Sequence, residues 1–195
     1  MIRYSLTVVG LMIAALVVQQ FMPTFTGIHS SRILLLQLVF LCAAVTVGQP
    51  TMLLLAFIGG VLWDAQCALG PEVGDPEVYK EPVENLRFGF SVLLFGALGF
   101  LMQGIQPLYR TGKWQFSVVL CGIAIFFYLA AEYLLITFLR GGFVLTRATF
   151  MQMVYTSVLT MLVSPFVLWL LERIARRCGH SLHPQPRRRN RLGWT

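Results

Sequence analysis

Long apolar stretches without a single charge alternate with short polar segments along the chain. The uncharged stretches cover residues 4–31, 33–63, 88–109, 114–131 and 148–171. Each is close to or longer than the ~20 apolar residues that a helix needs to cross about 30 Å of hydrocarbon. Transmembrane barrel strands alternate polar and apolar residues, and these stretches do not. The pattern therefore predicts membrane-spanning helices.

The stretch 33–63 is too long for one crossing. Its 31 residues would reach about 47 Å as a single helix at ~1.5 Å per residue. Gly48 and Pro50 in "VGQPT" interrupt helical hydrogen bonding, and Pro50 suits the first turn of a new helix. The sequence thus predicts six spans, at about 4–22, 33–47, 51–69, 88–108, 116–138 and 150–171. The second span is short, which is compatible with a half-buried or tilted hairpin.

Composition excludes an ordinary soluble domain. Of the 195 residues, 57% are hydrophobic and only 12% are charged, whereas globular chains carry roughly 25% charged residues. The apolar part of the first stretch, 4–22, is longer than a signal-peptide core, and no A-x-A cleavage site follows it. We therefore expect an all-α integral membrane protein whose six-helix transmembrane bundle occupies residues 1–172, followed by a tail at 173–195.

Lysine and arginine asymmetry predicts that both termini are cytoplasmic. In this orientation ten basic residues lie inside and five lie outside; the outer five are Arg32, Lys80, Arg87, Arg140 and Arg147. The segment 71–87, "PEVGDPEVYKEPVENLR", is acidic and suits an outward loop.

The tail after the last span is basic and contains two prolines. It lacks apolar periodicity, so we expect it to be disordered and to lie against the anionic inner leaflet, where each basic residue contributes about 1 kcal/mol. A docking site for a cytoplasmic partner is an alternative use. No motif supports a nucleic-acid contact.

Two acids lie inside predicted spans. Asp64 follows "GGVLW" in the third span, and Glu132 lies in "FFYLAAEYLLITFL" of the fifth. An ionised side chain at the bilayer centre costs about 2.5 kcal/mol or more, so such an acid needs an explanation. Both acids fall at similar depth in the outer third, within reach of outer arginines. Three interpretations compete. The acids hold helices together by hydrogen bonds, or they line an outward pocket for a ligand or a partner's residue, or they take part in catalysis.

Sequence motifs give catalysis little support. The four cysteines occur singly and the three histidines lie outside the apolar stretches, so no metal or haem site is predicted. The chain has no GxSxG, no HExxH and no glycine-rich phosphate loop, the motifs that would mark familiar catalytic sites. We expect a protein that is not an enzyme and that has no cofactor.

Small residues mark the fourth span. Gly89, Gly96, Gly99 and Gln103 lie near one helical face, which allows a neighbouring backbone to approach closely or forms a ligand groove. In the last span, Pro165 removes a backbone donor and predicts a kink.

Three segments of the chain, at residues 56–70, 88–110 and 154–177, have a familiar order: "AFIGGVLWDAQCALG", "FGFSVLLFGALGFLMQGIQPLYR" and "VYTSVLTMLVSPFVLWLLERIARR". Together they resemble the MreD family of bacterial rod shape-determining membrane proteins. "AFIGGVLWDAQCALG", with Gly59, Gly60 and Asp64, resembles the glycine, apolar pair and aspartate element of that family's third span. "FGFSVLLFGALGFLMQGIQPLYR", which ends at Arg110, resembles its next span, and "VYTSVLTMLVSPFVLWLLERIARR" resembles its last. The match covers most of residues 33–177 in order. The chain departs from the family in the inserted acidic stretch 71–87 and in its longer basic tail.

The resemblance implies a non-enzymatic scaffold of the cell-wall elongation machinery in the bacterial inner membrane. The implied partners are an MreC-like membrane protein, the actin-like MreB, and the wall polymerase and transpeptidase. Arg110 and the tail are candidates for cytoplasmic contacts. The family's fold is similar to that of the substrate-binding subunits of energy-coupling-factor vitamin transporters, and a small-molecule transporter subunit is therefore the alternative function.

Overall fold

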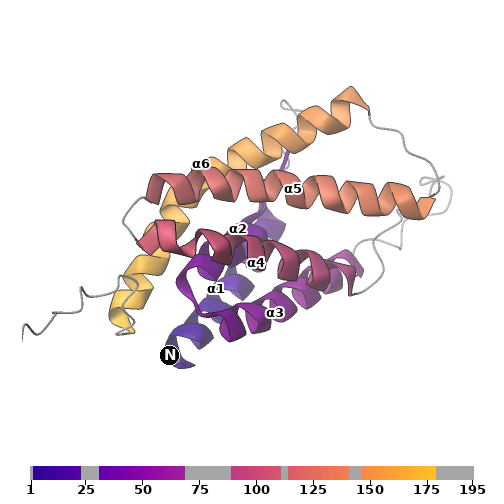
Figure 1. Ribbon diagram of the computed structural model, residues 1–195. Helices are drawn as coiled ribbons and strands as arrows, with labels where there is room; N and C mark the ends of the chain where they lie inside the picture. Colours follow the sequence, from indigo (N-terminus) through magenta and orange to yellow (C-terminus); the bar gives the residue numbers. More distant parts are fainter. Residues whose placement is uncertain (1, 23–30, 69–88, 111–113, 141–145, 179–195) are drawn as a thin grey trace, which may run out of the picture.

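The regular structure of the chain is helical throughout the residues that the structure describes (Figure 1). This computed structural model describes residues 2–22, 31–68, 89–110, 114–140 and 146–178. Its helices are α1 (Ile2–Phe21), α2 (Leu35–Thr46), α3 (Gln49–Ala68), α4 (Phe90–Arg110), α5 (Trp114–Arg140) and α6 (Arg147–Arg177). Each predicted span coincides with one of these helices, and the all-helical class is confirmed. The predicted loop 71–87 lies outside the described residues.

Four helices are long and apolar enough to cross a membrane: α1, α4, α5 and α6. They have the properties expected of a multi-pass membrane protein. Helix α2 is apolar but has only 12 residues, which corresponds to about 18 Å at ~1.5 Å per residue. It is therefore too short to cross about 30 Å of hydrocarbon alone.

The stretch 33–63 is interrupted where the sequence predicted. Val47 adopts an extended conformation after the last turn of α2, and α3 begins at Gln49 with Pro50 in its first turn. Proline is tolerated there because the amides of a first helical turn have no intrahelical partner. The chain thus passes from one helix to the next with almost no connecting segment.

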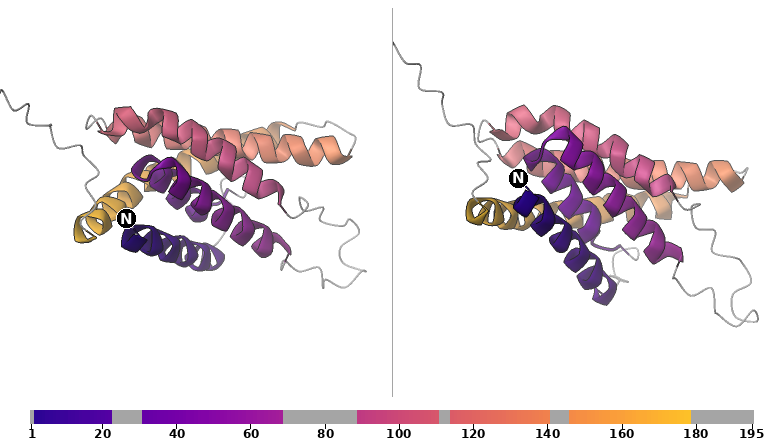
Figure 2. Two further views of the ribbon diagram at one scale, coloured as in Figure 1. Left: turned by 60° about the horizontal axis from the view of Figure 1, so that its bottom comes forward. Right: turned by 90° about the horizontal axis from the view of Figure 1, so that it is seen from below.

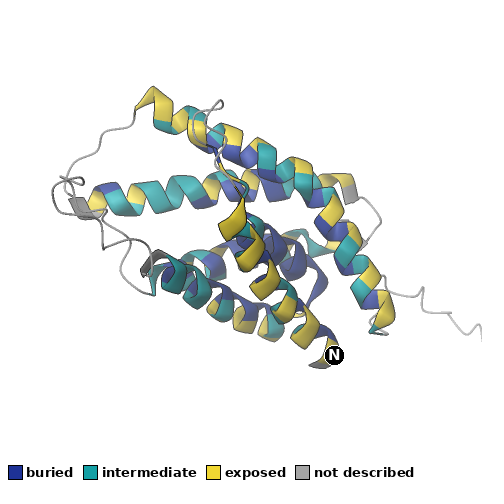
Figure 3. Cartoon of the chain, turned by 180° about the vertical axis from the view of Figure 1, so that it is seen from behind, coloured by how far each residue is buried: buried dark blue, intermediate teal, exposed yellow. Residues whose placement is uncertain are grey.

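Helix α2 forms the centre of the molecule. Every residue from Leu36 to Thr46 is buried, and α2 contacts all five other helices. Figure 3 shows it as dark blue ribbon among helices whose outward faces are yellow. A helix that is apolar on all sides is expected in such a buried position.

Side chains of other helices satisfy the first amides of α2. Its N-cap residue, Leu34, has no side chain that can accept a hydrogen bond. Instead, the amide of Leu36 donates to Oε1 of Gln19 in α1 at 3.0 Å. The amide of Leu34 donates to the hydroxyl of Thr160 in α6 at 3.3 Å. Two neighbouring helices thus supply the cap that the local sequence lacks.

The last carbonyls of α2 are satisfied by helix α4. The side-chain amide of Gln106 donates to the carbonyl oxygens of Val45 and Val47, both at 3.0 Å. Gln103 donates to the Val47 carbonyl at the longer distance of 3.5 Å. The carbonyl groups of Val45 and Val47 at the α2–α3 break are therefore hydrogen-bonded, because α4 provides the donors.

Helix α6 is longer than the predicted span 150–171 and bends along its length (Figures 1 and 3). Pro165 lies inside it and removes one backbone donor, which accounts for a bend.

The prediction that the tail begins at 173 is wrong for its first five residues, which continue the helix to Arg177. An ion pair of 2.7 Å between Glu172 and Arg176, one turn apart, supports this extension. Residues 179–195 lie outside the described residues.

Replacement of Gln19 by leucine tests the capping of α2. Gln19→Leu removes the acceptor of the buried Leu36 amide, and we expect it to lower the free energy of unfolding by about 1–3 kcal/mol. The neighbouring Gln20 is exposed, so Gln20→Leu is a matched control with the same change in polarity. Thermal unfolding of both variants in one detergent would measure the difference. Equal stability of the two would contradict this role of Gln19.

Candidate functional site

Asp64 lies near the end of α3 with only 5% of its surface exposed. Its Oδ2 accepts a hydrogen bond of 2.6 Å from the backbone amide of Gly89. Gly89 directly precedes α4 and has φ +104°, a conformation that glycine adopts without a Cβ clash. A carboxylate at the beginning of a helix also interacts favourably with the helix dipole. Asp64 therefore joins α3 to the beginning of α4.

Glu132 of α5 belongs to the same region. Its carboxylate is within electrostatic range of Asp64 and close to the indole N–H of Trp63. The indole nitrogen of Trp63 is buried and donates no hydrogen bond to any of the described residues. Asp64 on α3 and Glu132 on α5 thus lie in the same region of the molecule, and α4 contacts both of these helices.

Of the two acids, Asp64 has a hydrogen bond that joins helices. Asp64 uses one oxygen for a backbone amide, which leaves less of the carboxylate for a ligand. Among the described residues, no three histidine, cysteine, aspartate or glutamate side chains gather as metal ligands would.

Two adjacent glycines of α3 allow close contacts with neighbouring helices. A Cβ added to Gly60 would lie 2.5 Å from the Cα of Val92 in α4. One added to Gly59 would lie 2.7 Å from Cε of Met12 in α1 and 3.0 Å from the ring of Phe95. Backbone approach of this kind is typical of glycine at helix interfaces in membranes. The "GG" pair therefore packs α3 against α1 and α4.

The glycines of α4 have different surroundings, although the sequence places them near one face. Gly99 is buried in contact with Met52 of α3 and with the ring of Phe40 of α2. Gly96 has no atom within 4 Å of an added Cβ. Gly99 thus belongs to the internal packing of the bundle, and Gly96 lies on an open face.

The remaining candidate residues of the sequence lie apart from the acids. Gln103 helps to close the end of α2, Arg110 is the last residue of α4, and Pro165 lies within α6. These three residues therefore form no common site with Asp64.

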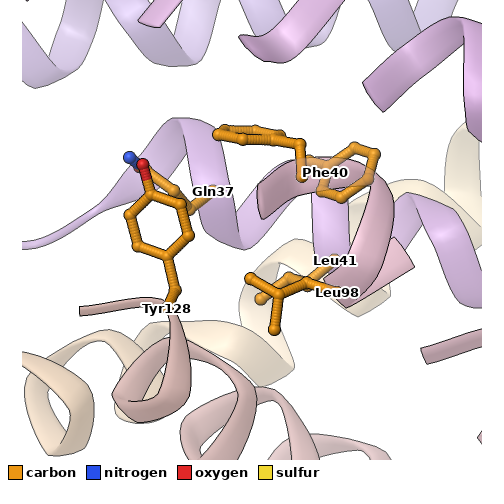
Figure 4. A pocket seen from close by; sticks show the side chains of 6 residues that line it. Gln37, Phe40, Leu41, Leu98 and Tyr128 are labelled. Atoms are coloured by element: carbon orange, nitrogen blue, oxygen red, sulfur yellow. The ribbon is translucent and has the colours of Figure 1, made fainter. Parts of the chain in front are cut away.

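A small cavity lies at the centre of the bundle, between α2, α4 and α5 (Figure 4). Its lining residues are Gln37, Phe40, Leu41, Phe95, Leu98 and Tyr128. The cavity measures about 10 Å³, which is about the space that one water molecule needs. Gln37 is 2% exposed, and neither atom of its amide has a hydrogen-bond partner among the described residues.

Sequence reasoning missed several of the polar side chains that organise the core. Gln19, Gln37 and Gln106 are amides inside apolar stretches, and Trp63 directly precedes the aspartate. The sequence does contain a signal for these residues, because a polar side chain within a membrane span usually faces a neighbouring helix. Of the glutamines within the spans, only Gln103 is named from the sequence, as part of the small-residue face of the fourth span. The hydrogen-bond partners themselves are not visible in the sequence.

Comparisons with known proteins do not identify the chain. No protein-family model matches it, and the searches of curated proteins and of solved structures give no significant match.

Two replacements of Asp64 distinguish a hydrogen-bonding role from a role of its charge. In Asp64→Asn the side-chain oxygen can still accept from the Gly89 amide, so we expect a small effect. Asp64→Leu leaves that amide without its acceptor and should cost about 1–3 kcal/mol of stability. Thermal unfolding and complementation of a depleted strain would measure both. Equal loss of function in the two variants at normal protein levels would mean that the charge itself is required.

Proposed function

We propose that this chain is a non-enzymatic scaffold of the bacterial cell-wall elongation machinery, as its resemblance to the MreD family implies. In this proposal it holds the membrane helix of an MreC-like partner and so connects wall synthesis outside the cell with the MreB filament inside. The main supporting observation is the use of the intramembrane polar groups. Gln19, Asp64, Gln106 and Thr160 all hydrogen-bond to the backbone of other helices. These four side chains therefore serve the packing of the bundle.

We further propose six crossings in the inner membrane with both termini in the cytoplasm. The beginning of α1 and the end of α6 lie at the same end of the molecule, where the Thr7 hydroxyl and the Cys178 sulfur are 3.9 Å apart. This is compatible with an even number of crossings. In this arrangement α2 is a short, enclosed crossing, since irregular backbone is tolerated at membrane depth only where protein surrounds it.

The central cavity favours a scaffold over a vitamin-transporter subunit. Pockets for small molecules usually measure about 300–1,000 Å³. The cavity beside Gln37 measures about 10 Å³, so it suits a water molecule and not a vitamin.

The outward face of α4 offers a partner helix small residues beside large apolar side chains, because Leu93 and Phe100 are 70% and 47% exposed on the same face. Ala97 and Gly104 are exposed, and both Gly96 and Gly104 have open space where a Cβ would lie. Small residues on an exposed face allow a second helix to pack closely. We therefore assign the MreC-like helix to the face that contains Gly96, Ala97 and Gly104. Gly99 is excluded from this face because it is buried.

Cysteine crosslinking tests this assignment. Gly96→Cys and Gly104→Cys, in a chain whose Cys67 and Cys178 are replaced by serine, should crosslink to cysteines in the membrane helix of MreC. Leu162→Cys is the matched control, because this residue is 66% exposed on α6, a helix that does not contact α4. Equal capture from Leu162 and from the α4 positions would contradict the assigned face.

Depletion tests the function itself in the same strain. Rod-shaped cells should become round or swollen when the chain is removed, because wall insertion would lose its connection to the filament. Normal shape together with failed uptake of a vitamin would replace the scaffold with the transporter subunit.

A further inference from the structure

The last turns of α6 expose a face that is apolar along most of its length and cationic at its end. Its residues are Leu162, Phe166, Trp169, Arg173 and Arg177. They are spaced three or four positions apart, so they lie on one side of the helix. The first three are 66%, 62% and 52% exposed, and both arginines are exposed. The face is therefore open to a membrane along its whole length.

Aromatic contacts order the middle of this face. The rings of Phe166 and Trp169 stack with centroids 6.1 Å apart. The guanidinium of Arg173 lies 5.2 Å from the centre of the Trp169 ring, within the range of a cation–π contact. Tryptophan is enriched where hydrocarbon meets headgroups. Arg173 thus lies beside a side chain of the type found at that boundary.

Helix α1 brings a third arginine to the same end. The hydroxyl of Thr7 lies 3.9 Å from the sulfur of Cys178, the residue after α6. Figures 1 and 2 show the beginning of α1 beside the end of α6 in every view. Arg3 is exposed there, one turn before Thr7. This end therefore combines cations from two helices.

Local acids do not neutralise these cations. Glu172 pairs with Arg176 at 2.7 Å. Arg3, Arg173 and Arg177 have no acidic partner among the residues that the structure describes. Three guanidinium groups are therefore available to an anion.

We propose that this end of the molecule binds an anionic phospholipid. The phosphate is bound by Arg173, Arg177 and Arg3, because guanidinium groups form paired hydrogen bonds with phosphate oxygens. The acyl chains lie along Leu162 and Phe166. A free phosphate ion would use the arginines alone, whereas a lipid also covers the apolar stripe that leads to them.

Lipid selectivity of the full chain measures this binding. The chain is reconstituted in phosphatidylcholine bilayers with spin-labelled phosphatidylglycerol or spin-labelled phosphatidylcholine, and the preference is read from the immobilised spectral component. We expect the variant Arg3→Gln/Arg173→Gln/Arg177→Gln to lose at least about fivefold of the preference for phosphatidylglycerol, since this is the contribution of about one basic residue at an anionic surface. The single variant Arg177→Gln should lose less of the preference for phosphatidylglycerol. It replaces the triple variant in the test if the triple variant fails to fold.

The control is Arg32→Gln/Arg147→Gln, which removes two exposed arginines from other parts of the structure and should change the preference less than about twofold. An unchanged preference in the arginine variants would overturn the proposal. So would an equal loss in the control, which would mean a nonspecific charge effect. Displacement of the labelled lipid by inorganic phosphate, beyond the effect of chloride at equal ionic strength, would also overturn it in favour of a simple anion site.

Discussion

The hydrogen bonds from Gln106 to the carbonyl oxygens of Val45 and Val47 close the end of a helix whose last residues are buried. Both valines are almost completely buried. An unsatisfied backbone group in such surroundings costs several kcal/mol. Helix α2 can therefore end within the bundle only if another helix provides hydrogen-bond donors for the carbonyl oxygens of its last turn. This requirement fixes the position of α4 along α2.

The other contacts of α4 depend on that position. With Gln106 at the end of α2, Gly99 comes to lie against α2 and α3, and Val92 packs on Gly60. The beginning of α4 then places the Gly89 amide at Asp64. The contact with Asp64 is thus the last in the series that runs along α4 from Gln106 to Gly89. The buried carboxyl group of Asp64 accepts a hydrogen bond from that backbone amide.

Local sequence was sufficient to predict the helices but not their contacts. Run lengths and the Gly48–Pro50 break determine where helices form, because a helix depends on neighbouring residues and on length. The partner of Asp64 is 25 residues away, and the acceptor for Leu36 is 17 residues away. Such pairs depend on how the helices are placed, which periodicity does not encode. The same limit explains why Gly99 and Gly96, three residues apart, differ in their surroundings.

The central claim is that α4 side chains hold the buried end of α2 in place. Hydrogen–deuterium exchange of the full chain in lipid nanodiscs tests it directly, through the backbone amides of residues 43–47. We predict strong protection in the unmodified chain and exchange at least about tenfold faster in Gln106→Leu, which corresponds to ~1.4 kcal/mol of lost local stability. Gln115→Leu, at an exposed glutamine of α5, should leave protection unchanged. Equal protection of α2 in Gln106→Leu and in the unmodified chain would contradict the claim.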